Sequence, residues 1–320
     1  MRPHDTKILK LIVATIFALV IGSFTALAQE INDPVKLEIF NRFAANRGPH
    51  PETAYQIAKE YLQKYQKDND KYTQYVEKWV SIHERYESYD PKTRLSLLIN
   101  IKNFAGAFRL GAQILEKEPD DLSTQIALAD AGYRAGVNKD ERYNTEALGY
   151  ARKAIEAIEN GKTPTAWTPF KGKEDALANL YYTKGFLALQ TNADESIDSL
   201  LKATKYESEI RRNPLTYYFL AVAYETGPYK KMADTYRFDG KPDLSENPAA
   251  LERLNALLDR VIDAYARAIA TSDKGPWTAQ GRDEWMNAMT AYYKYQHNGS
   301  DKGKAEFIAN VLQSPLPSKP

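Results

Sequence analysis

Apolar residues recur along the chain at spacings of three and four, the pattern of a helix with one buried face. Between Glu52 and Gln66 they form a single stripe, made of Ala54, Ile57, Ala58, Tyr61, Leu62 and Tyr65. Lys59, Gln63 and Lys64 take the opposite side, so the segment is predicted to be an amphipathic helix packed on one face. Pro51 suits its first turn, because the N–H that proline lacks has no partner there.

Two further segments combine small and bulky apolar residues at the same spacing. They are 103–118, with Phe104, Ala107, Phe108, Gly111, Ile114 and Leu115 before Pro119, and 146–159, with Ala147, Ala151, Ala154, Ile155 and Ile158 before Gly161. Small residues let two helix backbones approach closely, so each helix needs an antiparallel neighbour. Suitable neighbours are 35–46, 94–101, 123–135, 175–190 and 214–225. Without a convincing strand or hairpin signal, the pattern predicts an all-α fold of stacked antiparallel helix pairs.

The pairs resemble tetratricopeptide repeats over residues 33–270. The first-helix pattern is matched by Tyr217, Leu220, Ala221 and Tyr224, and the second-helix pattern by Phe104, Ala107, Gly111, Ile114, Leu115 and Pro119. Ala54, Ala58, Tyr61 and Leu62 also match, whereas Ser196, Leu200, Ala203, Ala264 and Ala268 match more weakly. The resemblance implies a TPR-like α-solenoid. The second-helix marker residues, at positions 54, 107, 147 and 196, do not keep the regular spacing of about 34 residues. Irregular insertions between helices are therefore expected at 136–144, 163–173 and 227–247.

The amino-terminal segment has the order of a secretory signal peptide. Arg2, Lys7 and Lys10 precede an apolar run over 11–24, and Ala26-Leu27-Ala28 follows. We expect residues 1–28 to be cleaved before Gln29 and the protein to be exported, periplasmic or secreted. The alternative is a segment that stays uncleaved and anchors the chain in a membrane.

The remaining chain is predicted to have three parts. Residues 29–270 form the helical repeat domain, and 271–313, with Trp285, Met289, Tyr292 and Tyr293, form capping helices that cover the last repeat. Residues 314–320 contain three prolines and are predicted to be a mobile tail.

Charge and cysteine content exclude several functions. The 43 basic and 42 acidic residues nearly balance, and removal of the signal leaves 40 and 41. Nucleic-acid binding needs a concentrated basic surface, so no nucleic-acid partner is expected, nor a membrane unless the signal stays uncleaved. The absence of cysteine excludes disulfides, thiol catalysis and cysteine zinc sites.

The candidate chemical motifs are incomplete. His83-Glu84 lacks the second histidine of a zinc protease helix, and residues 298–304 have three residues between their glycines where a phosphate-binding loop has four. Asp68-Asn69-Asp70 starts like a calcium loop, but Tyr72 occupies the third ligand position. We therefore predict no catalytic, cofactor or metal site. Residues 68–70 are interpreted as a hydrophilic loop and 298–304 as a polar turn.

The chain is rich in aromatic residues, with 22 tyrosines and 4 tryptophans, several of them as adjacent Tyr-Tyr pairs. Neighbours on a helix point about 100° apart, so one member of each pair is free to line a groove. The tetratricopeptide resemblance implies a concave wall made by first helices, comprising Ile126, Asp130, Tyr133, Tyr182, Tyr218 and Val222. Arg134 joins this partner-binding set, because Tyr and Arg dominate binding hot spots. The insertion 227–247 is a second candidate.

The sequence thus favours a non-catalytic protein–protein interaction scaffold of the bacterial cell envelope. It would bind a peptide or helix of another protein in its groove, without a cofactor and without turnover. Two alternatives stay open. One is a cell-wall glycan-binding module that uses exposed Tyr and Trp, and the other is an enzyme with an unrecognised carboxylate pair.

Overall fold

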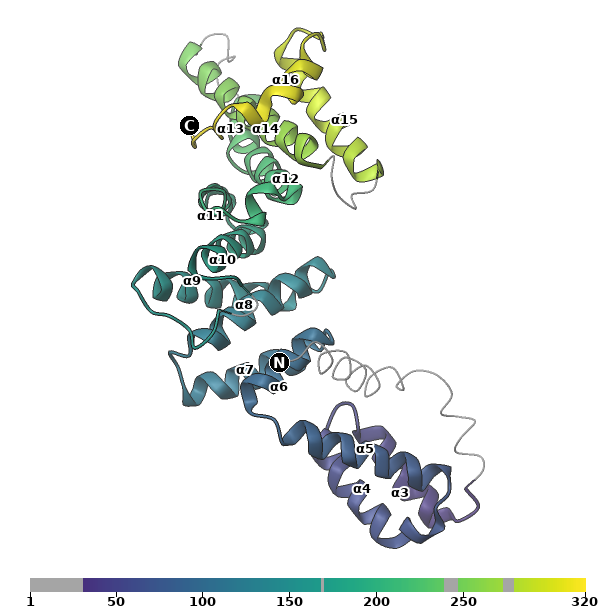
Figure 1. The fold of residues 1–320 in the computed structure, drawn as a ribbon. Coiled ribbons are helices and arrows are strands. Elements are labelled where there is room, and N and C mark those ends of the chain that lie inside the picture. The colour runs from purple at the N-terminus through teal and green to yellow at the C-terminus, as the bar shows by residue number, and fades with distance from the viewer. Residues whose placement is uncertain (1–30, 168–169, 239–246, 273–278) are drawn as a thin grey trace. The chain divides into compact units, whose positions relative to one another are not determined.

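A computed structural model describes residues 31–167, 170–238, 247–272 and 279–320 (Figure 1). The segment interpreted as a signal peptide lies outside the described residues. Every regular element in the described part of the chain is helical, and neighbouring helices pack against one another, so the prediction of an all-α fold of paired helices is confirmed. The chain divides into two compact units, one up to Leu110 and one from Gly111.

Residues 31–110, the described part of the first unit, contain four helices and the beginning of a fifth. They are α3 (Pro34–Asn46), α4 (Pro51–Tyr65), α5 (Lys71–Glu87), α6 (Pro91–Asn100) and the first half of α7 (Phe104–Lys117). Aspartates cap three of the helix starts, because the carboxylates of Asp33, Asp70 and Asp90 accept from first-turn backbone N–H groups. Helices α3, α4 and α5 enclose an aromatic core formed by Phe40, Phe43, Tyr61 and Tyr72.

A buried lysine connects α3 with the start of α5. Lys36 Nζ lies 2.6 Å from both Asp68 Oδ2 and Asp70 Oδ2, although only 6% of its side chain is exposed. Burial lowers the pKa of Lys36, but its hydrogen bonds to the two carboxylates outweigh that effect and the net pKa is raised. The turn that we interpreted as a hydrophilic loop is therefore an ion-pair partner of α3.

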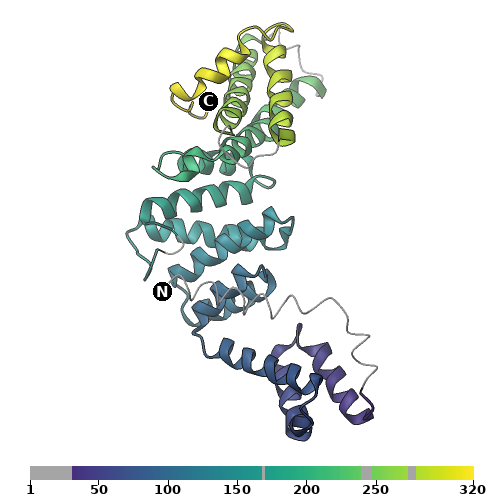
Figure 2. The same cartoon turned by 45° about the vertical axis from the view of Figure 1, so that its right-hand side comes forward.

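The second unit is a succession of packed helices. Its members are α8 (Leu122–Val137), α9 (Asn144–Glu159), α10 (Lys173–Ala188), α11 (Ala193–Ala203), α12 (Pro214–Tyr224), α13 (Lys230–Phe238), α14 (Pro248–Thr271), α15 (Ala279–Gln296) and α16 (Lys304–Asn310). Helices α8 and α9 form one pair and α10 and α11 the next, and α12 packs on both α11 and α14. Figure 2 shows α8 to α12 lying one beside the next.

Small residues set the distance between paired helices, as the sequence predicts. A Cβ atom on Gly111 would lie 2.6 Å from Leu128 Cδ2, and one on Gly185 would lie 2.6 Å from Leu200 Cγ. Ala151 and Ala154 are fully buried in the core of this unit. Contacts this close leave no room for a larger side chain.

The carboxy-terminal residues differ from the prediction of a mobile tail. Arg267 Nη2 donates to the carbonyl oxygens of Ser314 and Pro315, both at 3.0 Å, and Arg260 Nε donates to that of Ser318 at 2.8 Å. Lys319 forms an ion pair with Asp194 on α11 at 2.9 Å. Side chains of α14 and α11 therefore hold residues 314–320 in place, and the three prolines fit an extended segment.

Candidate functional site

Aromatic side chains from α8, α10, α12 and α15 form one row of touching rings in the second unit. The row, here named the aromatic strip, consists of Tyr133, Tyr182, Phe186, Phe219, Tyr218 and Trp285. It contains all three tyrosines that the sequence placed on a groove wall. The alternate helices α8, α10 and α12 each supply at least one ring, because α10 packs against both α8 and α12.

Ring distances show that the strip is continuous. The Tyr133 ring lies 5.4 Å from Tyr182 and 5.2 Å from Phe186. Phe219 follows at 5.1 Å from Phe186, and Tyr218 at 5.6 Å from Phe219. Most pairs are tilted or edge-to-face, the arrangement that aromatic rings prefer. Only Tyr218 and Trp285, 5.3 Å apart, are stacked.

Two of the predicted groove residues are in the core instead. Ile126 is 4% exposed and Tyr182 is 3% exposed, so neither can form an open wall. Helix α10 packs against α9 and α11 as well as against α8 and α12. Tyr181 therefore meets Glu159 on α9, while the Tyr182 hydroxyl lies 3.2 Å from that of Tyr133 on α8. The expectation that one of two adjacent tyrosines stays available is wrong for a helix with neighbours on several sides.

The other predicted residues are partly exposed. Tyr133, Tyr218 and Val222 are half-buried, and Arg134 Nε forms an ion pair with Asp130 Oδ2 at 2.7 Å. Burial raises the pKa of Asp130, and Arg134 opposes that rise. The structure thus brings Tyr133, Tyr218 and the Asp130–Arg134 pair to the strip with part of their surface in solvent.

Tyr218 has a packing role that the sequence did not reveal. Its ring contacts Tyr265 of α14 at 6.4 Å and stacks on Trp285 of α15. Trp285 is only 7% exposed. Tyr218 therefore helps to hold α15 against α12, and its replacement would disturb this helix packing as well as any ligand binding at the strip.

The strip ends at a carboxylate. Tyr265 Oη donates to Glu225 Oε2 at 2.7 Å, and Tyr292 Oη donates to Glu225 Oε1 at 2.6 Å. Glu225 is the first residue of η4 (Glu225–Tyr229), a kinked turn that follows α12, contains Pro228 and has a non-helical backbone at Gly227. The turn comes close to α11, since a Cβ atom on Gly227 would lie 2.4 Å from Ala193 Cβ.

Sequence reasoning did not find Phe186, Phe219, Glu225 or the role of Trp285. Phe186 follows Tyr182 by four residues, which places both on one face of α10, and this signal was available. Nothing in the sequence pattern indicated Phe219 as a site residue except its position next to Tyr218. Trp285 and Glu225 reach the strip only through tertiary packing.

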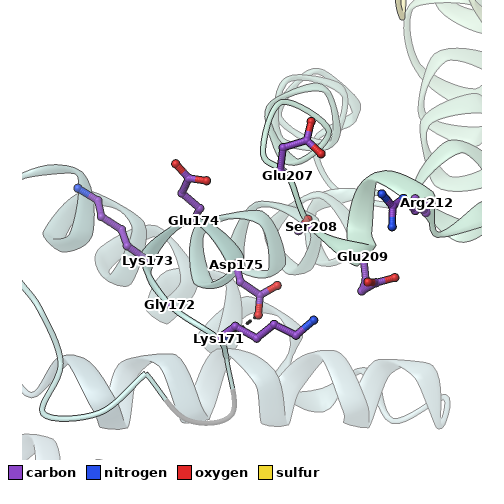
Figure 3. A pocket seen from close by; sticks show the side chains of 9 residues that line it. All are labelled: Lys171, Gly172, Lys173, Glu174, Asp175, Glu207, Ser208, Glu209 and Arg212. Carbon is purple, nitrogen blue, oxygen red and sulfur yellow. Dashed lines mark hydrogen bonds between the residues drawn. The ribbon is translucent and has the colours of Figure 1, made fainter.

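A hollow lies elsewhere in the second unit, between the start of α10 and the 3-10 helix η3 (Glu209–Arg212). Its volume is about 540 Å³. It is lined by Lys171, Gly172, Lys173, Glu174, Asp175, Glu207, Ser208, Glu209 and Arg212 (Figure 3). Three basic and four acidic side chains nearly cancel here, and the Lys171 backbone N–H is bound by Asp175 Oδ2 at 2.9 Å. The hollow therefore has no strong excess of positive or negative charge that would attract a charged ligand.

The three histidines in the described part of the chain are engaged in aromatic or backbone contacts. His83 stacks on Trp79 with ring centroids 5.1 Å apart, and His297 stacks on Tyr293 at 4.0 Å. His50 precedes α4. The described residues contain no group of three or more His, Asp or Glu side chains that could hold a metal ion. Residues 298–303 form the polar turn that the sequence predicts before α16.

The insertion 227–247 is described in part. It contains η4 from Gly227 onward and α13, whereas 239–246 lie outside the described residues.

The helices in the described ranges are too short or too polar to cross a lipid bilayer. The chain matches no protein-family model, no curated protein and no solved structure.

Proposed function

We propose that this protein is a non-catalytic scaffold that binds a polypeptide segment of another protein across the aromatic strip. The observation that carries the proposal is the continuity of the strip, in which rings from α8, α10, α12 and α15 touch in one row. Aromatic residues offer large contact areas at low entropic cost, and clusters of them are typical of binding surfaces. The neighbouring Asp130–Arg134 pair supplies polar contacts at the edge.

The helix arrangement supports the same function. Paired helices stacked in succession present one row of side chains from each pair, which suits an extended peptide or a helix as a ligand. The resemblance to tetratricopeptide repeats belongs to this proposal. Export to the cell envelope belongs to it as well, and rests on the order of charged, apolar and small residues in 1–28.

Capture experiments with matched variants test the proposal. Tyr133→Ala combined with Arg134→Ala removes a half-buried ring and a partly exposed guanidinium from the strip edge. We expect a polypeptide that co-purifies with the wild type to bind the double variant at least about tenfold more weakly, the usual effect of losing a hot spot. The amount retained in quantitative pull-downs from the protein's own cell envelope is the measurement.

The matched control is Lys153→Ala combined with Glu156→Ala, two exposed positions on α9. This variant should retain the partner as the wild type does, and both variants should keep the helical circular dichroism signal. Equal retention by the strip variant and the control would contradict the proposal.

A further inference from the structure

The carboxylate at the end of the aromatic strip has two hydrogen-bond donors and, among the described residues, no cation beside it. Both donors to Glu225 are neutral hydroxyl groups, those of Tyr265 and Tyr292. Within the described part of the chain, no Lys, Arg or His nitrogen lies at ion-pair distance from Glu225, and nearby Lys230 pairs with Asp234. Each carboxylate oxygen has two lone pairs, so each can accept one more hydrogen bond.

The charges around this end of the strip are acidic. Burial is the main cause that raises the pKa of the Tyr218 hydroxyl, and the carboxylates of Glu225 and Glu284 raise it further. Burial also raises the pKa of Tyr265 and of Tyr292, and Glu225 again adds to both shifts. The charges named as acting on these three hydroxyl groups are therefore those of carboxylates.

Aromatic faces add to the attraction for a cation. The Tyr218 ring stacks on Trp285 and lies 6.4 Å from the Tyr265 ring, and the Tyr229 and Tyr292 rings form an edge-to-face pair at 5.8 Å. Ring faces attract ammonium and guanidinium groups through their quadrupole. Glu225, Tyr218, Tyr229 and Tyr292 are all half-buried, so each keeps some contact with solvent.

The backbone holds Glu225 in place. Glu225 directly follows the end of α12, where the chain kinks at Gly227, and it lies between Tyr265 on α14 and Tyr292 on α15. A charge fixed by two hydroxyl groups loses little freedom when it binds, which favours affinity.

We propose that this acidic end of the strip, formed by Glu225, Tyr265 and Tyr292, receives a lysine or arginine side chain of the bound polypeptide. The inference rests on the proposed function and specifies its ligand. The remainder of the partner segment lies along the strip, where the rings contact its apolar side chains. A guanidinium fits best, because it pairs with a carboxylate through two hydrogen bonds and stacks on aromatic rings.

Peptide libraries test this selectivity without knowledge of the natural partner. The probes are immobilised random dodecapeptides in four sets, with a central Arg, Lys, Gln or Glu. We expect the purified protein to be retained about tenfold more by the Arg set than by the Gln set, with the Lys set between them and the Glu set lowest. Glu225→Gln keeps the size of the side chain and one acceptor oxygen, and its NH2 group donates to the hydroxyl that loses its acceptor. This variant should retain the Gln set and lose the preference for Arg. Glu156→Gln, an exposed carboxylate on α9, is the control and should leave that preference intact.

The outcomes separate the two proposals. Equal retention of the wild type by the Arg and Gln sets, or an unchanged preference in Glu225→Gln, overturns the cation inference but leaves peptide binding by the strip. Failure of every set to retain the wild type overturns both. If Glu225→Gln does not fold, the wild type alone decides, because a preference carried by an ion pair must shrink between 0.05 and about 0.5 M salt.

Discussion

Replacement of Arg267 by methionine is expected to lower the free energy of unfolding of the second unit by about 3 kcal/mol. Arg267 is 4% exposed, and its Nε lies 2.6 Å from Asp263 Oδ1. The same guanidinium donates to the carbonyl oxygens of Ser314 and Pro315. Its removal leaves a largely buried carboxylate without its hydrogen-bonded cation and two carbonyl groups without their donor, and both losses carry the cost of desolvation.

The cost should depend on pH in a defined direction. Burial raises the pKa of Asp263, although Arg267 opposes that rise. Without Arg267 the pKa in the folded variant rises further above its unfolded value of about 3.9. A carboxyl group whose folded pKa is raised favours folding at low pH and disfavours it once ionised. The deficit of the variant should therefore be largest at pH 7 and shrink toward pH 5, as measured by hydrogen exchange of α14 amides in increasing urea.

Two variants separate the buried ion pair from a general effect of removing arginine. Arg152 also pairs with a carboxylate, that of Glu195, but half of the Arg152 side chain is exposed. Arg152→Met should therefore cost at most about 1 kcal/mol. The double variant Asp263→Leu, Arg267→Met removes both charges and should recover much of the loss. A single variant as stable as the wild type at pH 7 would show that the pair and its carbonyl contacts contribute nothing.

Replacement of Gly185 by valine should destabilise the second unit by about 3 kcal/mol. Gly185 lies where α10 meets α11, and an added Cβ atom would approach Leu200 Cγ at 2.6 Å and the backbone oxygen of Ser196 at 3.2 Å. Leu200 can change rotamer, but the Ser196 carbonyl moves only if α11 moves. The Ser196 hydroxyl also donates to the Gly185 carbonyl oxygen at 2.8 Å, a bond that such a shift would break.

Gly149 provides the matched control for this prediction. It lies in the middle of α9, and a Cβ atom there would meet nothing within 4 Å. Gly149→Ala should stabilise the protein by up to about 1 kcal/mol, because alanine favours the helix. Thermal unfolding followed by circular dichroism compares the two variants. The packing argument fails if Gly185→Val unfolds at the wild-type temperature.

Local patterns were sufficient to predict most helices. The stripe from Ala54 to Tyr65 corresponds to α4, and Pro214 marks the start of α12 because a proline in the first turn fits the helix. Helix α5 is missing from the helices that the sequence analysis predicts. Helix α13 lies inside a segment interpreted as an insertion. In both cases the cue was local, namely Asp70 as a cap and the apolar stripe of α13.

The candidate site depended more strongly on tertiary packing. The sequence identified Tyr133 and Tyr218, since aromatic residues on first helices are visible in the pattern. It could not show that α10 has neighbours on several sides, which buries Tyr182 together with Tyr181. Glu225 and Tyr292 are 67 residues apart, and nothing in the local pattern of either residue indicates their hydrogen bond. The same holds for the contact of Arg267 with residues 314 and 315.

Site-specific photo-crosslinking in the cells that make the protein tests the central claim most directly. A photoreactive phenylalanine analogue would replace Arg134, next to Tyr133, or Val222, one helical turn after Tyr218 on α12. In the controls it would replace Lys153 or Glu156 on the exposed side of α9. The account predicts that 134 and 222 give covalent adducts with the same polypeptide, whereas 153 and 156 give none. Adducts of equal yield at all four positions, or adducts at 153 and 156 alone, would contradict it.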